Sequence, residues 1–193
     1  MTHHSFYHDE TERRKWQNPE KILDEIGLKQ GHTFIDVGCG NGFFTLPAAR
    51  LVGAEGRVSG VDIDEEAIRR IRRKAADEDL KNLTLRVGEA ENTVLCEACG
   101  DVVFFGIVLH DFNDVAKVLA NSMRMLKPTG RLVDLDWKKQ RMLLGPPYQI
   151  RFSQKKAAEL VRSAGFEIEK TTNSGLYHYM IIGKLPSSTS TSK

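Results

Sequence analysis

The chain has 193 residues, enough for one domain with a sizeable core and too few for two large ones. Hydrophobic residues make up 40% and charged residues 28%, which is typical of a globular protein and excludes a disordered or collagen-like chain. The formal net charge of +2 is too even to indicate a nucleic-acid partner. The longest apolar run, residues 102–109, is far shorter than the roughly 20 residues of a membrane span, so we expect no membrane partner.

The N-terminus and the cysteines indicate the compartment. The first residues lack the apolar core of a secretory signal, and three cysteines argue against a disulfide framework, so we expect a cytoplasmic protein. Cys96 and Cys99 have the spacing of a redox or metal pair, but no second pair of ligands completes a zinc site. We therefore interpret them as ordinary loop and core cysteines and predict no metal.

Helices and strands alternate along the chain. The predicted elements are a helix over 19–27, a strand over 33–37, a helix from about 42, a strand over 57–61, a helix over 64–76, strands over 83–87 and 101–105, a helix over 115–126, a strand over 131–135, a helix over 153–164, and closing strands over 166–171 and 176–182.

This alternation predicts an α/β protein with a single doubly wound Rossmann-like sheet, mostly parallel and with helices on both faces. The short turn at 173–175 predicts that the last two strands pair as an antiparallel C-terminal hairpin. We expect one domain over residues 1–185, with residues 1–17 as an N-terminal lid segment. The low-complexity tail over 186–193 is predicted to be disordered.

A glycine-rich loop, Asp36-Val37-Gly38-Cys39-Gly40-Asn41-Gly42, joins the first strand to the next helix. Glycines at alternate positions let the backbone turn sharply and approach a ligand closely. A dinucleotide-binding loop has its third glycine at the sixth position, where this chain has Phe43. The spacing therefore disfavours a dinucleotide. A nicotinamide-dependent oxidoreductase, which would need one, is kept only as an alternative function.

The loop resembles the first motif of the class I S-adenosylmethionine-dependent methyltransferases, in the small-molecule branch similar to the ubiquinone and menaquinone biosynthesis methyltransferases. The resemblance runs from about residue 18 to residue 184 and implies the cofactor S-adenosyl-L-methionine. The loop residues that it identifies as cofactor-binding are Asp36, Gly38, Cys39, Gly40 and Gly42.

Three later strand ends complete the cofactor site that the resemblance implies. Asp62 ends the second strand, where a carboxylate can accept both ribose hydroxyl protons, and a helix cap is its alternative role. The resemblance implies that Ile63 packs on the adenine and that Glu89 and Ala90, where the family often has Asp-Ala, reach the adenine ring. Gly106 follows the fourth strand, in the stretch that the family places beside the methionine portion.

The candidate catalytic and substrate residues lie in later loops and in the lid. His110 can exchange a proton near neutral pH, and a structural role in the family's loop is its alternative. Trp137 and Tyr148 are interpreted as substrate-facing aromatics, with closure of the core under a loop as the alternative for Trp137. Tyr7 is expected to face the acceptor from the lid, and His8 is a second candidate base.

Together these features predict a methyltransferase that moves a methyl group in line from S-adenosylmethionine to a small-molecule acceptor. The cofactor supplies the chemistry, while the protein aligns the acceptor and excludes water. A catalytically inactive S-adenosylmethionine-binding partner protein is the second alternative. We expect a monomer or a homodimer.

Overall fold

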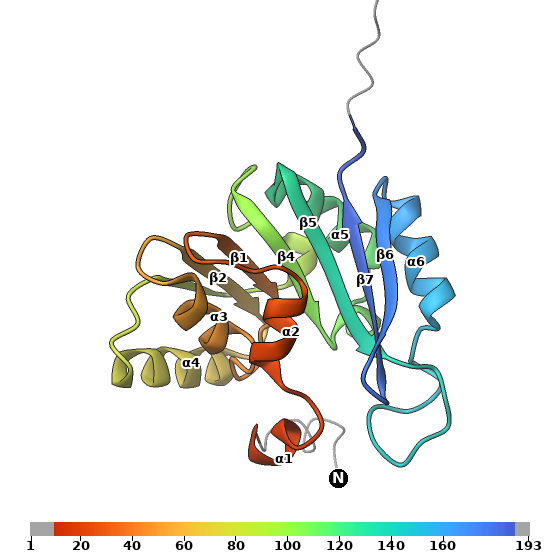
Figure 1. The fold of residues 1–193 in the computed structure, drawn as a ribbon, viewed down its shortest axis with the longest axis horizontal. Coiled ribbons are helices and arrows are strands. Elements are labelled where there is room, and N and C mark those ends of the chain that lie inside the picture. Colours follow the sequence, from red (N-terminus) through yellow and green to blue (C-terminus); the bar gives the residue numbers. More distant parts are fainter. Residues whose placement is uncertain (1–9, 188–193) are drawn as a thin grey trace, which may run out of the picture.

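The structure, a computed structural model, describes residues 10–187. Within these residues, seven strands form one sheet in the order β3-β2-β1-β4-β5-β7-β6 (Figure 1). Their bounds are β1 Thr33–Val37, β2 Arg57–Asp62, β3 Leu83–Val87, β4 Gly100–Gly106, β5 Leu126–Trp137, β6 Glu167–Ser174 and β7 His178–Lys184. The first five strands are parallel, and the order reverses between β1 and β4, which is the doubly wound arrangement that the sequence predicts.

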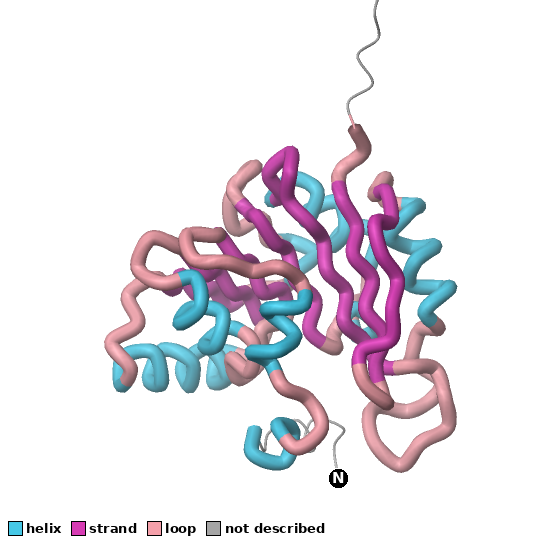
Figure 2. Tube along the Cα trace, viewed as in Figure 1, coloured by secondary structure: helices cyan, strands magenta, loops and turns pink. Residues whose placement is uncertain are grey.

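Helices cover both faces of this sheet, as Figure 2 shows. Alternate residues of a strand face opposite sides, so Val133 packs in one buried cluster with α2 and α3, and Leu132 in another with α5 and α6. A third cluster joins α4 to the glycine loop and α3. The helical bounds are α1 Glu10–Arg14, α2 Pro19–Glu25, α3 Thr45–Val52, α4 Glu65–Asp77, α5 Val115–Met125 and α6 Gln154–Ser163, with short 3-10 turns η2 Ala90–Asn92 and η3 Leu109–Asp111.

The C-terminal hairpin closes one edge of the sheet. β7 pairs antiparallel with both β5 and β6, which confirms the predicted departure from a plain parallel sheet. Among the described residues, no helix combines the length and the apolar character that crossing a membrane requires.

Two elements begin three or more residues away from their predicted starts. α3 begins at Thr45 and not near Gly42, because Gly42 has a φ of 84°, outside the right-handed helical region. β5 begins at Leu126, five residues early, because the 127–130 turn lies within the strand as an irregularity in its pairing with β4. Gly130 makes this turn possible, since a Cβ there would lie 2.6 Å from the Gly100 carbonyl oxygen.

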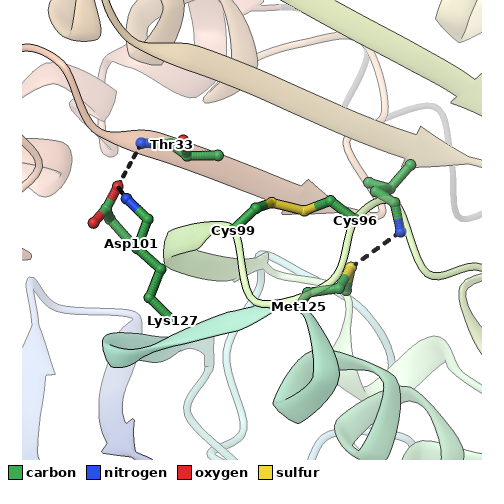
Figure 3. The surroundings of a disulfide bond; sticks show 7 residues. Thr33, Cys96, Cys99, Asp101, Met125 and Lys127 are labelled. Atoms are coloured by element: carbon green, nitrogen blue, oxygen red, sulfur yellow. Dashed lines mark hydrogen bonds and ion pairs between the residues drawn. A yellow bond between two sulfur atoms is a disulfide. The ribbon is translucent and has the colours of Figure 1, made fainter.

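A disulfide joins Cys96 and Cys99 in the segment leading into β4 (Figure 3). The interpretation of these residues as ordinary loop and core cysteines did not foresee this bond. The N–H groups of Ala98 and Cys99 donate to the last carbonyls of α5, at 2.8 and 3.0 Å, and this folds the segment so that the two side chains meet. The pair lies at the amino end of β4, whereas Gly106 at the carboxyl end of that strand lines the cavity described below.

Candidate functional site

A cavity of about 1310 Å³ opens at the carboxyl ends of the parallel strands, where the strand order reverses. Loops after β1, β2, β3 and β4 line it, together with α1 and with Pro146 and Ile150 from the loop after β5. Ligands of doubly wound sheets bind at this place. Tyr7 and His8 lie outside the described residues. The predicted site residues that line the cavity are Asp36, Gly38, Cys39, Gly40, Asp62, Ile63, Glu89, Ala90, Gly106 and His110.

The glycine loop is held in the left-handed backbone region, with φ of 74° at Gly38, 50° at Gly40 and 84° at Gly42. A Cβ on Gly38 would lie 2.6 Å from Val108, and one on Gly42 would lie 2.9 Å from Ile71, so packing requires both glycines. A Cβ on Gly40 would meet no described atom within 4 Å and would stand at the cavity. Gly40 thus leaves open space at the cavity, whereas Gly42, absent from the lining, packs against Ile71 behind the loop.

Asp62 fixes the glycine loop and also lines the cavity. Its Oδ2 accepts a hydrogen bond from the Gly40 N–H at 2.7 Å, and its Oδ1 accepts from the Asp64 N–H at 2.9 Å. The cap of α4 is Asp64, whose side chain accepts from Glu66 and Ala67. Since a carboxylate oxygen can accept more than one hydrogen bond, Asp62 can still receive hydroxyl groups of a ligand.

Asp36 is the most buried acid of the lining, only 2% exposed. Its Oδ2 accepts a hydrogen bond from the Thr45 hydroxyl at 2.7 Å. Burial raises the pKa of Asp36 to about 7, the hydrogen bond from Thr45 opposes the shift, and the nearby negative charge of Asp62 adds to it. A cationic group beside Asp36 would remove much of this penalty, so the position suits a positively charged part of a ligand.

The rim on the β2–β3 side combines an apolar face with acceptors. Ile63 lines the cavity although it is 72% exposed. Glu89 accepts from the Asn92 amide, and Glu91 accepts from the Asn113 N–H at 3.0 Å, which places acidic side chains at the same rim. An apolar face next to carboxylate acceptors suits a heteroaromatic ring that carries an amino group.

The backbone directly after β4 is strained. Ile107 has a φ of 67°, a conformation that β-branched residues rarely adopt, and it is buried against the cavity. Its N–H donates to the Leu135 carbonyl at 2.7 Å, and this bond to β5 holds the turn in place. The turn leads into η3, which carries His110, so the strain lies where chemistry-bearing residues are positioned.

His110 forms a buried pair with Asp136 of β5. The His110 Nδ1 lies 2.8 Å from the Asp136 Oδ2, and the two side chains are 2% and 1% exposed. Burial alone would lower the pKa of His110, but the hydrogen bond to Asp136 and its charge, with a contribution from Asp111, raise it overall. Because a carboxylate accepts at Nδ1, that nitrogen carries the hydrogen, and Nε2 lies 3.5 Å from the Asp111 Oδ1.

Two further ionisable groups lie near Asp136 on the same side of the sheet. Asp134 precedes it by two residues on β5, and Tyr179 is its partner across the β5–β7 register. Burial and the charge of Asp136 hold the pKa of Asp134 well above its usual range, and burial raises the pKa of Tyr179 as well. Burial therefore favours the uncharged form of both groups. Across residues 10–187, no three His, Cys, Asp or Glu side chains are grouped to hold a metal ion.

Arg13 of α1 lines the cavity, although the sequence analysis does not identify it. Its guanidinium lies 3.9 Å from the centroid of the Phe43 ring, and its Nε donates to Gln17 at 2.7 Å. An ion pair of 2.9 Å between Glu10 and Lys74 attaches α1 to α4. The described part of the predicted lid therefore borders the cavity and brings a positive charge next to the glycine loop.

Trp137 and Tyr148 do not line the cavity. Trp137 is buried, with ring centroids 5.4 Å from Trp16 and 4.3 Å from His178. A Cβ on Gly145 would lie 2.8 Å from the indole, so the loop after β5 packs directly on Trp137. This geometry matches the alternative role, in which Trp137 closes the core under a loop. Tyr148 belongs to that loop and is 43% exposed.

Comparison with known families gives a match over most of the described chain. Residues 28–176 match the family model of a methyltransferase domain. The matched segment contains all five parallel strands and every predicted cofactor residue.

Two curated proteins are similar to the chain in sequence. Nocamycin O-methyltransferase of Saccharothrix syringae is 34% identical over 112 residues, which are 58% of this chain and 40% of that protein. Demethylmenaquinone methyltransferase of Listeria monocytogenes is 30% identical over 122 residues, which are 63% of this chain and 51% of that protein. The chain thus spans about half the length of these relatives, or less.

A solved structure agrees over nearly the whole length of both chains. The crystal structure of a SAM-dependent methyltransferase from Aquifex aeolicus aligns with a TM-score of 0.85 and 29% sequence identity. The alignment covers 90% of this chain and 93% of that one.

Proposed function

Because this chain belongs to the methyltransferase domain family, we propose that it is an S-adenosylmethionine-dependent methyltransferase that acts on a small-molecule acceptor. One observation carries the proposal: a single cavity is lined by the glycine loop, by Asp62 and by His110, whose Nδ1 pairs with the buried Asp136. Its volume of about 1310 Å³ leaves room for a cofactor and a small acceptor together. A nicotinamide cofactor is the weaker candidate, since Phe43 occupies the position of the third glycine.

The cavity lining fits the nucleoside part of the cofactor. Asp62 would accept the ribose hydroxyls, Ile63 would cover one face of the adenine, and Glu89 would accept from the adenine amino group. The open position at Gly40 supports this fit, because any Cβ there would fill space that the cofactor needs. When bound, S-adenosylmethionine supplies an electrophilic methyl group on a positively charged sulfur.

The lining also offers one partner for each charge of the cofactor's amino-acid end. Asp36 would ionise to pair with the ammonium group, which its raised pKa of about 7 allows near neutral pH. Arg13 would bind the carboxylate, for which its planar guanidinium is suited. Both lie beside the glycine loop, and the positive charge of Arg13 acts on Asp36.

On the acceptor side, we assign His110 the role of general base. Asp136 holds Nδ1, so Nε2 would take the proton of an acceptor hydroxyl or amine, and the Asp136 charge would stabilise the imidazolium that forms. Because Asp136 raises the pKa of His110, turnover should increase with pH until the imidazole is neutral. The acceptor class is therefore a small molecule with an acidic O–H or N–H group. A cytoplasmic location and a monomeric or homodimeric state stay predictions.

Titration calorimetry with S-adenosylmethionine, S-adenosylhomocysteine and NADH tests the cofactor. Binding of the first two, and not of NADH, is the expected result, and the reverse would refute the proposal. Turnover is then measured on a panel of small phenols, enols and amines with isotopically labelled cofactor. Cofactor binding without methylation of any panel member would favour the inactive partner protein over the enzyme.

A further inference from the structure

One end of the molecule carries an exposed basic and apolar surface that the proposed chemistry does not use. It consists of the loop after β5, the start of α6 and the β6–β7 turn, and we name it the mouth surface. In Figure 1 the loop and the turn both project beyond the carboxyl end of β5. Its residues are Lys138, Lys139, Arg141, Leu143, Tyr148, Ile150, Lys155, Lys156 and Leu176.

The charge of this surface has one sign. Residues 138–156 contain six Lys or Arg and no Asp or Glu, in a chain whose net charge is only +2. Arg151 is buried and donates to the carbonyls of Pro146 and Leu144, at 2.8 and 2.7 Å, so it braces the loop from inside. Lys138 and Lys139 are half-buried, and each Nζ donates to a loop or turn carbonyl, so Arg141, Lys155 and Lys156 are the exposed cations of the surface.

The start of α6 adds an observation that folding does not explain. Its first turn carries Lys155 and Lys156 and no acidic residue. The positive end of the helix dipole disfavours cations at that place and favours carboxylates. The two exposed lysines there do not stabilise the helix through its dipole, and they add to the positive charge of the mouth surface.

The apolar side chains of the mouth surface point away from the core. Leu143 is fully exposed, Leu176 is 80% exposed, and Tyr148 and Ile150 are both more than 40% exposed. Lys138 joins the loop to the turn, because its N–H donates to the Tyr177 carbonyl at 2.8 Å and its Nζ lies 3.1 Å from the Leu176 carbonyl oxygen. The two exposed leucines thus belong to segments that are tied together.

We propose that the mouth surface docks on an anionic lipid bilayer. Exposed leucines and an amphipathic tyrosine would enter the headgroup region, and the three exposed cations would pair with lipid phosphates, which is the combination that interfacial binding requires. This contact is peripheral and needs no spanning helix. A second copy of this chain suits the surface less well, because the cations of the two copies would repel each other.

The place of the surface indicates the source of the acceptor. Ile150 belongs to the mouth surface and lines the cavity, and Pro146 of the same loop lines it too. A bilayer at this surface would therefore face the cavity opening and supply an amphiphilic acceptor with an apolar tail. This last step rests on the proposed methyl transfer, whereas the docking itself does not.

Co-sedimentation with vesicles tests the docking without any turnover. The full chain is mixed with vesicles of phosphatidylcholine alone or of phosphatidylcholine with phosphatidylglycerol, at low and high salt. We expect partitioning to the anionic vesicles to be at least about tenfold stronger and to weaken with salt. The Leu143→Asp/Leu176→Asp and Lys155→Glu/Lys156→Glu variants should each lower it at least about fivefold.

The matched control reverses two exposed charges at the amino ends of β2 and β3, with Arg57→Glu/Lys81→Glu, and should bind vesicles as the parent does. Cofactor binding by calorimetry should be unchanged in every variant, so a failed docking is distinguishable from a failed function. Equal binding to neutral and anionic vesicles, or normal binding by both mouth-surface variants, would overturn the proposal. Conversion of a dimer to a monomer by the leucine variant, with vesicle binding intact, would instead assign the surface to a subunit interface.

Discussion

Replacing Asp36 with asparagine separates the stability of the protein from its affinity for the cofactor. The folded pKa of Asp36 is about 7, above the ordinary value of 3.8, so the folded state holds the proton more tightly than the unfolded chain does. The contribution of this group to the free energy of unfolding is therefore largest below about pH 4 and declines as the pH rises to about 7. Asparagine has nearly the same shape and can still accept the Thr45 hydrogen bond, but it does not titrate.

The magnitude follows from the shift. Each pKa unit corresponds to about 1.4 kcal/mol, so the wild type should lose about 3 kcal/mol of unfolding free energy from this group between pH 5 and pH 8. The Asp36→Asn variant should keep this free energy, because asparagine does not titrate. The other titrating groups, Asp134 among them, are present in both proteins, so their contributions cancel when the two are compared. Urea denaturation of both proteins at the two pH values measures the difference.

The Asp36→Asn variant should bind the cofactor more weakly than the wild type, although at pH 8 it should be the more stable protein. At pH 8 the variant lacks the negative charge that would pair with the ammonium group, so we expect binding weaker by about 1.5–3 kcal/mol. A more stable protein that binds more weakly would support Asp36 as a ligand-binding acid. If the unfolding free energies of the two proteins change equally with pH, the argument that burial raises the pKa of Asp36 is refuted. Unchanged affinity for the cofactor would remove Asp36 from the site.

Three further substitutions test the remaining parts of the cavity. Gly40→Val should abolish cofactor binding in a folded protein, with about 1–3 kcal/mol of backbone strain, and retained affinity in calorimetry would place the ligand elsewhere. Asp62→Ala should weaken cofactor binding by about 1.5–3 kcal/mol and should also free the Gly40 N–H; normal binding would count against the ribose role. Asp136→Asn should lower turnover and move its pH profile to lower pH, because His110 loses the charge that raises its pKa; an unshifted profile would argue against His110 as the base.

The residues that we propose to bind the cofactor could be placed at the cavity from the sequence, because they belong to short contiguous motifs. The segment from Asp36 to Gly42, and the residues after Asp62, each follow directly on a parallel strand. Strand ends of such a sheet converge on one edge, so identifying each strand was enough to place its motif at the cavity. The winding of the sheet and its closing hairpin were predictable for the same reason, since turn residues and apolar periodicity are local signals.

The acceptor side depends on contacts between distant parts of the chain. Asp136 meets His110 only because β4 and β5 pair in a particular register. The signal in the sequence that could have indicated this contact was the two-residue period of the strand. Leu132 is buried on the side of α5 and α6, so Asp134 and Asp136, two and four residues later, face the same core. The position of Arg13 at the cavity was harder to predict from the sequence, because a helix of five residues has no hydrophobic period. The position of this helix depends on an ion pair between Glu10 and α4.

The strained turn at Ile107 has a consequence for engineering. Its left-handed backbone costs about 1–3 kcal/mol, which glycine or asparagine at this position would relieve. A screen for heat resistance would therefore select such replacements. The same replacements would loosen the step from β4 into η3 and widen the range of orientations of the imidazole three residues later. Because we propose that this imidazole is the general base, selection for melting temperature at this one position would act against turnover, and a directed-evolution programme would do best to leave it unchanged.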